Sequence, residues 1–410
     1  MLSKLLALAV SNQGANYWIA TLSQSSRDVI GKDIAVDSTG VYLVGDIVYD
    51  SEIAYTHAFA AKYTFQGALV QQVRAGSATD GYFATSSAVT LRPDNEDGVK
   101  AVTCGKLVEA GVDYGFLLGY GENLPSNSSL PYVSFDGIEC SDVAFGSDGQ
   151  HYLSGHGDST PLLWIKYLTS PTARQIATAS VNTVSRSVAL DSSNNAYIAG
   201  SRSWTPFGGS AIPRGYITKF NNSGTLQWQR DAGFITTNVP WFSTIYDVTV
   251  STSGSLYAIT NRIMKVDAST GNLTWARTLG SATFQAATTD DDDNLYIAGS
   301  NYIAKYDSSG TIQWQRQIVG ATDFVGIAHY LNAVYVIGTT GSSAFIAKLP
   351  DDGSLTGTYG SFTYQASSLS AATSSTSFSS VSLTASSLSL SETPAPDLSA
   401  STMTSSTVVL

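Results

Sequence analysis

A two-part phrase recurs along this chain and constrains its fold more than any other feature. The first part reads DSTGVYLVGD at 37–46, DSSNNAYIAGS at 191–201 and DDDDNLYIAGS at 290–300. The second part reads YITKFNNSGTLQWQR from Tyr216, IMKVDASTGNLTWAR from Ile263 and YIAKYDSSGTIQWQR from Tyr302. A unit that recurs every ~40 to 60 residues indicates a radial or stacked array of small units.

Each unit is predicted to contain four short strands. Its first half is a hairpin with a polar turn and a return strand carrying Tyr-x-x-Gly. Clear copies lie at 33–45, 187–200 and 286–299, and weaker ones at 141–155, 247–260 and 326–338. The most divergent copy is 87–105, where Val102 holds the Tyr position. Its second half is a strand ending in Lys, a turn with Gly, and a strand that holds Trp228, Trp275 or Trp314 with Arg two residues later. Apolar and polar residues alternate with period two, as strands require.

Seven such units without a helical period predict an all-β chain. The expected fold is a β-propeller of seven blades of four antiparallel strands, followed by an extended Ser/Thr-rich C-terminal tail. The stretch YWIATL at 17–22 is interpreted as a further copy of the Lys strand, with Thr21 in the Lys position, that closes the ring. An eight-bladed ring with one degenerate blade is the alternative.

The recurring Lys and the Trp-x-Arg pairs are interpreted as packing elements. A Lys on a strand can lay its stem on apolar surface and keep its ammonium group in water. The Arg of each pair is expected over an aromatic ring or near a carboxylate, between blades.

The composition changes after Tyr359. Residues 361–410 contain 18 serines and 8 threonines and no Lys or Arg. Such a segment buries too little apolar area to offset ~1–2 kcal/mol of backbone entropy per residue. We therefore expect an N-terminal docking segment (1–16), a propeller (17–359) and a C-terminal assembly tail (360–410) held by another molecule. The expected tail anchors are apolar side chains: Leu369, Phe378, Val381, Leu383, Leu388 and Leu390.

Charge and cysteine content exclude several classes of protein. The net charge is −11 and no basic stripe occurs, which disfavours nucleic acid as a partner. No stretch approaches the ~18 to 20 apolar residues of a membrane span. Cys104 and Cys140 fit no metal or redox motif and are expected to be buried.

No residue is predicted to be catalytic, to bind a cofactor or to bind a metal. His57, His151, His156 and His329 form no metal-spaced cluster, and no nucleophile elbow occurs. The acidic run Asp290–Asp293 could hold Ca²⁺, but its sister sequences read as a hairpin turn.

Aromatic residues in long inserts are the candidate binding residues. They are Trp204, Phe207, Trp241 and Phe242. A third insert spans 119–137. Aromatic side chains in variable loops on a rigid scaffold commonly form binding surfaces, and capping of blade edges is the structural alternative.

The unit F-I-A-K-x-x-x-x-G-x-L-x-W…D-x-A-V-D-S-x-G-x-x-Y-x-x-G resembles the seven-bladed propeller repeats known as SBBP repeats, over about residues 17–359. The junction LPDDGSLTGTYGSFTYQASSLSAAT, from Leu349, resembles the end of virion structural proteins of tailed bacteriophages. That resemblance implies a non-enzymatic tail nozzle, fibre or adhesion component located in the virion. Its implied partners are other virion proteins, further copies in an oligomer or larger assembly, and a host surface glycan or protein.

Two other functions remain open. One is a secreted carbohydrate-binding or glycan-hydrolysing propeller, which for hydrolysis needs two carboxylates ~5–10 Å apart. The other is a periplasmic quinoprotein-like scaffold, because VDASTGNLTWAR from Val266 resembles the tryptophan motif of that family. The start MLSKLLALAV has a shorter apolar run than a usual secretion signal, which counts against both.

Overall fold

The computed structural model describes most of the propeller and parts of the C-terminal segment. The described ranges are 17–50, 55–75, 82–93, 98–109, 111–122, 132–157, 160–167, 172–177, 183–204, 212–232, 244–374, 376–380, 384–388, 392–393, 398–400 and 404–409. Within them the chain consists of strands and turns and contains no α-helix. In this part of the chain there is accordingly no helix of the length and hydropathy that a membrane crossing requires.

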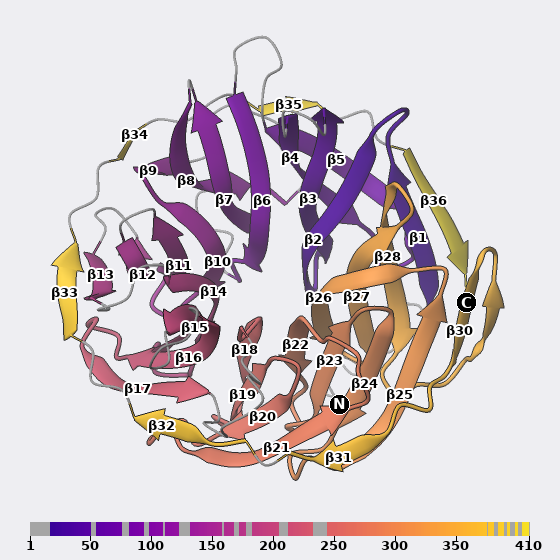
Figure 1. The fold of residues 1–410 in the computed structure, drawn as a ribbon. Coiled ribbons are helices and arrows are strands. Elements are labelled where there is room, and N and C mark those ends of the chain that lie inside the picture. Colours follow the sequence, from indigo (N-terminus) through magenta and orange to yellow (C-terminus); the bar gives the residue numbers. More distant parts are fainter. Residues whose placement is uncertain are drawn as a thin grey trace, which may run out of the picture.

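The strands of the described residues form seven sheets arranged around one axis (Figure 1). The first sheet contains β2 (Asp28–Asp37), β3 (Gly40–Asp50), β4 (Tyr55–Tyr63) and β5 (Leu69–Ala75). The second contains β6 (Tyr82–Leu91), β7 (Ala101–Glu109), β8 (Val112–Tyr120) and β9 (Tyr132–Asp136). The third contains β10 (Glu139–Phe145), β11 (His151–Gly157), β12 (Thr160–Tyr167) and β13 (Thr172–Ala177). The fourth sheet contains β14 (Thr183–Leu190), β15 (Ala196–Trp204), β16 (Ile212–Phe220) and β17 (Leu226–Ala232). The fifth contains β18 (Asp247–Val250), β19 (Leu256–Ile259), β20 (Ile263–Val266) and β21 (Leu273–Leu279). The sixth contains β22 (Ala286–Thr289), β23 (Leu295–Gly299), β24 (Tyr302–Tyr306) and β25 (Ile312–Val319). The last combines β26 (Thr322–Tyr330), β27 (Ala333–Thr340) and β28 (Ser343–Pro350) with β1 (Trp18–Ser23). Each sheet is one blade, which we name by its innermost strand.

The ring is closed at two levels. The innermost strands β2, β6, β10, β14, β18, β22 and β26 each contact the next, and β26 contacts β2. The predicted closing strand is β1, which runs antiparallel to β28 with Trp18 opposite Lys348. Strand β1 is therefore the fourth strand of the β26 blade, although it precedes β26, β27 and β28 by about 300 residues in the chain. The all-β propeller prediction is confirmed.

The place of β1 within its blade differs from the prediction. Lys219 lies opposite Trp228 and Lys305 lies opposite Trp314 in the other blades. Trp18 faces Lys348 in the same way, so YWIATL is the fourth strand of its unit and supplies the Trp position. The sequence match to the Lys strand was a coincidence of apolar alternation.

Close packing explains the Tyr-x-x-Gly of the repeat. The Tyr is fully buried in six copies: Tyr42, Tyr152, Tyr197, Tyr257, Tyr296 and Tyr335. The Gly faces a β-bulge of the innermost strand, as at Gly45 and Gly200. A Cβ at Gly45 would overlap the carbonyl oxygen of Ile30, and one at Gly200 would overlap that of Val184. Since a bulge bends its strand toward its neighbour, only glycine leaves room for it.

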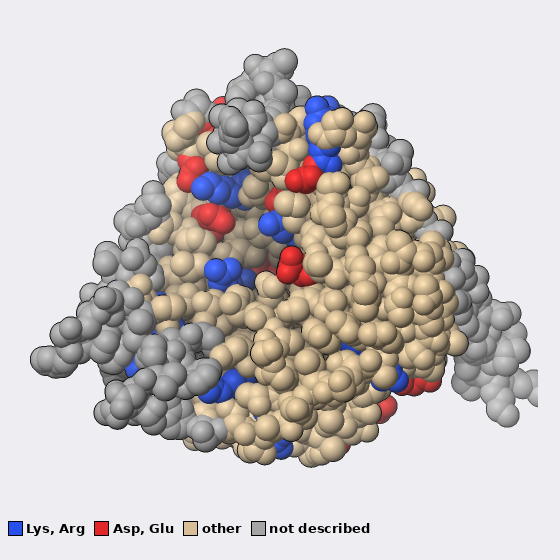
Figure 2. All heavy atoms as spheres, turned by 45° about the vertical axis from the view of Figure 1, so that its right-hand side comes forward, with Lys and Arg blue, Asp and Glu red and all other residues tan. Residues whose placement is uncertain are grey.

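The disc has two rims. We call turn rim the one that carries the polar turns, such as 37–40, 191–195 and 307–311. We call loop rim the opposite one, where β2 begins at Asp28 and β15 ends at Trp204. Figure 2 shows that one face of the disc is hollowed and that many of the charged side chains on that face gather around the hollow.

The C-terminal residues lie around the outside of the same propeller (Figure 1, yellow). The segment starts with a short hairpin of β29 (Gly357–Tyr359) and β30 (Phe362–Ala366). Further strands are β31 (Ala371–Thr373), β32 (Phe378–Ser380), β33 (Thr384–Leu388), β34 (Glu392–Thr393), β35 (Leu398–Ala400) and β36 (Thr404–Val409). Strands β30 to β36, which we call the belt, pair antiparallel with β25, β21, β17, β13, β9, β5 and β1 in that order.

The expectation that another molecule orders this segment is therefore wrong for the described belt strands. The outer strand of each blade offers unpaired backbone N–H and C=O groups, and the belt fills them. Backbone hydrogen bonds to these edges supply the stabilisation that burial of apolar side chains alone could not. Ser and Thr suit such a position because their hydroxyl groups keep the exposed outer face of the belt hydrated.

The predicted tail anchors fare unequally. Leu369 packs beside Gly280 and against the apolar cluster around Ile259, and Phe378 packs against the cluster that includes Trp228. Leu388 ends β33, with its backbone opposite Ala173. Three predicted anchors lie outside the described residues, as does the N-terminal segment 1–16: Val381, Leu383 and Leu390.

Candidate functional site

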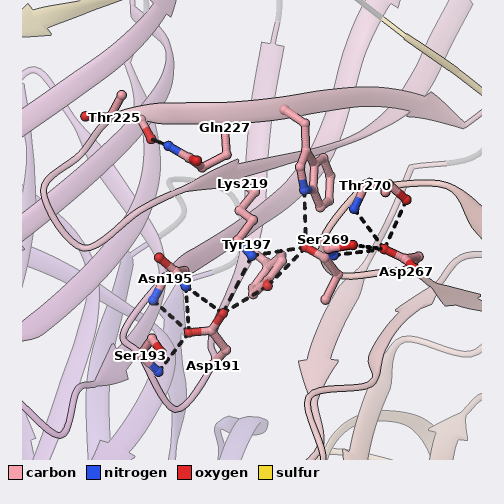
Figure 3. A network of polar contacts seen from close by, with 12 residues as sticks. Asp191, Ser193, Asn195, Tyr197, Lys219, Thr225, Gln227, Asp267, Ser269 and Thr270 are labelled. Atoms are coloured by element: carbon pink, nitrogen blue, oxygen red, sulfur yellow. Dashed lines mark hydrogen bonds and ion pairs between the residues drawn. The ribbon is translucent and has the colours of Figure 1, made fainter.

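Asp191 shows how the Asp of the repeat builds its turn (Figure 3). Its Oδ1 accepts hydrogen bonds from the backbone N–H groups of Ser193 (3.0 Å) and Asn195 (2.9 Å). Its Oδ2 accepts from the Asn195 amide (2.8 Å) and the Tyr197 hydroxyl (3.0 Å). Burial alone would raise the pKa of Asp191, but these hydrogen bonds outweigh it and leave the pKa lowered. The carboxylate therefore stays ionised as a structural group.

Lys219 and Trp228 join this blade to the next one. The Lys219 ammonium lies 4.9 Å from the Tyr197 ring centroid and donates to the carbonyl oxygen of Ala268 at 3.1 Å. The Trp228 indole N–H donates to the same oxygen at 3.2 Å (Figure 3). Arg230 lies over the Trp228 ring. We call this inter-blade arrangement the staple.

The staple recurs in the following blades. Lys265 and Trp275 both donate to Ser308, each at 3.2 Å, while Lys348 (3.3 Å) and Trp18 (3.0 Å) both donate to Phe65. Trp314 donates to the carbonyl of Asp351 at 2.9 Å. The interpretation of these residues as blade-to-blade packing is confirmed. The lysine side chains are less exposed to solvent than expected, because Lys62 and Lys348 are buried.

Three carboxyl groups on innermost strands form a second set of inter-blade bonds, which we call the axial ring. Each accepts a backbone N–H from the innermost strand of the following blade: Asp33 from Val89 (2.8 Å), Asp142 from Val188 (2.7 Å) and Asp247 from Ala287 (2.7 Å). Between them, the Ser187 hydroxyl donates to Asp247 at 2.7 Å. These bonds fix the innermost strands to one another around the axis.

Burial raises the pKa of all three groups of the axial ring. That of Asp33 rises to about 7, that of Asp247 to about 6, and that of Asp142 well above its ordinary value. The charges of Asp33 and Asp247 raise the pKa of Asp142 further. Both oxygens of Asp33 accept backbone N–H groups, one from Ile34 in its own strand and one from Val89 in β6. This carboxyl group therefore holds β2 and β6 together.

Toward the loop rim, the innermost strands carry polar residues at their bulges. Lys32 lies 3.5 Å from the Asp46 carboxylate, and the Ser141 hydroxyl lies 3.4 Å from Nδ1 of His156. Arg186 is exposed and lies over the Tyr246 ring at 5.9 Å. We call Lys32, Ser141, Arg186 and Tyr246 the axial mouth. It presents two cations on opposite parts of the ring in an otherwise acidic protein.

Of the four predicted binding aromatics, the structure describes the backbone of Trp204. Trp204 ends β15 at the loop rim, with its backbone opposite Ile212. Phe207, Trp241 and Phe242 lie outside the described residues. Sequence reasoning also missed the axial ring, although a shared Asp-Ile/Val-Ala/Thr pattern marks it at 33–35, 142–144 and 247–249.

Other sequence predictions are tested residue by residue. Cys104 and Cys140 are fully buried, as expected, and burial raises the pKa of both thiols. Asp290 makes its turn as Asp191 does, with Asn294 and Tyr296 as partners. Among the described residues, no group of three or more His, Cys, Asp or Glu side chains is placed to hold a metal ion.

Comparison with known proteins agrees on the fold. A family model described as outer membrane protein assembly factor BamB matches residues 213–402, and a model described as β-propeller repeat (SBBP) matches 163–201. Each covers less than half of the chain. Among curated proteins no match was found.

Solved structures show the same architecture at low identity. A catalytically inactive virginiamycin B lyase from Staphylococcus aureus with quinupristin is 12% identical, with 81% of this chain and 99% of that chain covered and a TM-score of 0.53. The WD40 β-propeller domain of Doa1 is 13% identical, with 81% and 97% covered and a TM-score of 0.54. Similarities at this identity show a shared β-propeller fold and nothing of activity.

Proposed function

We propose that the protein is a non-enzymatic structural component of a virus particle of the tailed-bacteriophage type. The observation that carries the proposal is how the repeat's polar residues are used. The Asp, Tyr, Lys, Trp and Arg of the described units bond turns and neighbouring blades to one another. The belt then adds one strand to the outer edge of every described blade. Such a disc is built as a rigid platform, and the resemblance of the 349–373 junction to phage virion proteins supplies the setting.

The platform binds its partners at the axis and along the loop rim. The axial mouth offers the exposed Arg186 and the half-buried Lys32 beside Asp46. Trp204 ends a strand at the loop rim, and the inserts with Phe207, Trp241 and Phe242 follow strands that end at the same rim. Loops on a rigid scaffold are where binding residues concentrate. The partners are other virion proteins or a host surface glycan or protein.

Particle association tests this proposal. The protein is expected to sediment with particles from the source culture, at a constant ratio to the other particle proteins. Changing Arg186→Glu is expected to lower the particle-bound fraction at least tenfold without changing the thermal unfolding midpoint. The matched control is Asp292→Lys, an exposed charge reversal on the turn rim, which leaves association unchanged. A wild-type protein found only in the soluble fraction would contradict the proposal.

A second candidate is a scaffold for protein assembly at the outer membrane. The match of residues 213–402 to the BamB model favours it, since that match runs from β16 through the belt strand β35. Cross-linking of the protein in its source cells, followed by mass spectrometry, separates the two. Cross-links to outer membrane proteins support this candidate, and cross-links to particle proteins support the first.

A further inference from the structure

The belt is built from short, separate pairings. Strands β31, β32 and β35 have 3 residues each, β34 has 2, and the terminal β36 has 6. Successive belt strands from β31 start six to eight residues apart, which spans about 20–26 Å of extended chain. Each pairing is weak by itself, because a few strand residues barely offset their own ordering entropy.

The ring of blades does not depend on the belt for its topology. Every strand that accepts a belt strand precedes it in the chain, and the belt visits the blades in the reverse of chain order. The belt therefore adds to the outer edges of blades that already have four strands of their own. Its beginning is fixed by the β29–β30 hairpin, whereas β31 to β36 pair with the outer strands of the other blades.

Apolar side chains anchor the beginning of the belt. Phe362 and Tyr364 of β30 are buried among residues of the β22 and β26 blades, and Leu369 fills the space beside Gly280. When a belt strand leaves, its blade exposes an unpaired outer edge, which must be covered again to avoid non-specific association. A second copy of this chain carries the same donor strands in the same register.

We propose that the outer edges of the blades are strand-acceptor sites whose partner is the belt of a second copy of this chain. The exchanged part runs from β31 to β36, whose strands have 2 to 6 residues each. Strand β30 stays on its own propeller because the β29 hairpin holds it. Belt exchange thereby links copies without any new interface, as in domain swapping.

Disulfide trapping between two labelled copies tests the proposal. Thr21 of β1 lies opposite Ser406 of β36, and Gln317 of β25 lies opposite Gln365 of β30. One copy carries Thr21→Cys and the other Ser406→Cys; the copies are mixed, unfolded, refolded together under reducing conditions and then oxidised. We expect cross-linked heterodimer in a yield that rises with protein concentration. The matched control pair, Gln317→Cys with Gln365→Cys, is expected to give at least tenfold less.

The outcomes decide between exchange and its alternatives. A single chain that carries both Thr21→Cys and Ser406→Cys is expected to form its disulfide within the monomer at low concentration. If it does not, the belt is not where the structure places it and the proposal fails. If no heterodimer forms at high concentration, or if the Gln317 pair cross-links copies equally well, belt exchange is refuted. The buried native cysteines stay in place, and the wild-type chain gives the background.

Discussion

At the scale of single residues, the repeat is a set of reciprocal contacts across blade boundaries. Trp228 lies against the turn of the next blade at Gly271, where the backbone is left-handed (φ 71°) and a Cβ would come within 2.7 Å of the indole ring. The tryptophan of one unit thus packs directly on the turn glycine of the next unit. This explains why Gly and Trp-x-Arg recur together along the chain.

Substitution can separate the packing role of Gly271 from its role in the turn. Gly271→Ala and Gly254→Ala both place a side chain at positive φ (71° and 85°), which costs about 1 kcal/mol each. Gly271→Ala must in addition displace Trp228 and Arg230, whereas a Cβ at Gly254 meets nothing within 4 Å. We expect Gly271→Ala to lower the thermal unfolding midpoint by several degrees more than Gly254→Ala. Equal shifts by calorimetry would show that the staple contributes nothing.

The axial ring makes stability depend on pH in a defined window. Burial raises the pKa of Asp33 to about 7 and that of Asp142 above its ordinary value, so the folded state holds protons that the unfolded chain releases at lower pH. Their contribution is present below the unfolded pKa and is lost as pH rises through the folded pKa. His57, whose pKa burial lowers to about 4, acts in the opposite direction but only below its ordinary pKa of 6.5.

Stability is therefore expected to fall as pH rises from about 6.5 to 8. Asp33→Asn removes the group whose pKa burial raises to about 7 and is expected to flatten the pH dependence of the unfolding midpoint in this window. Asp267→Asn is the control, because hydrogen bonds from Ser269 and Thr270 lower the pKa of Asp267 to about 2 and keep it ionised throughout. A slope that Asp33→Asn leaves unchanged would assign the pH dependence to other groups.

At the scale of strands, local patterns predicted the blades well and their edges poorly. The alternation and turn residues of 187–200 and 286–299 identify hairpins, because both strands and the turn lie in one short segment. The belt has no such signal, since its partners are backbone groups 40 to several hundred residues away and Ser or Thr side chains report little of them. The axial ring was missed for the same reason: Asp142 bonds Val188 in another blade.

Strand β1 is expected to be the most sensitive strand of the closure. Ala20 lies between Ile346 of the ring and Thr407 of the belt, so proline there removes a ladder hydrogen bond from a central strand and distorts it. Ala372, in the belt strand β31, pairs only with Thr278. We expect Ala20→Pro to abolish soluble folded protein and Ala372→Pro to cost only a few degrees of midpoint. Comparable losses in the two variants would place the closure elsewhere.

At the scale of the whole molecule, the staples are unevenly distributed. They connect four successive boundaries, from the β14 blade through the β18, β22 and β26 blades to the β2 blade, by way of Trp228, Trp275, Trp314 and Trp18. The outer strands β9 and β13 carry no tryptophan. Within the described residues, the tryptophan staples thus lie along one arc of the disc.

This asymmetry predicts where the disc opens first. Native-state hydrogen exchange followed by mass spectrometry is expected to show slower exchange in β18–β28 than in β6–β13, because local opening begins where the fewest tertiary contacts must break. Trp275→Phe keeps the ring but removes its bond to Ser308, so it should speed exchange on both sides of the boundary between the β18 and β22 blades and leave β6–β13 unchanged. Each lost bond corresponds to about 1 kcal/mol, or roughly a fivefold change in the opening equilibrium. Uniform exchange around the disc would mean that the belt, and not the staples, sets the stability of the ring.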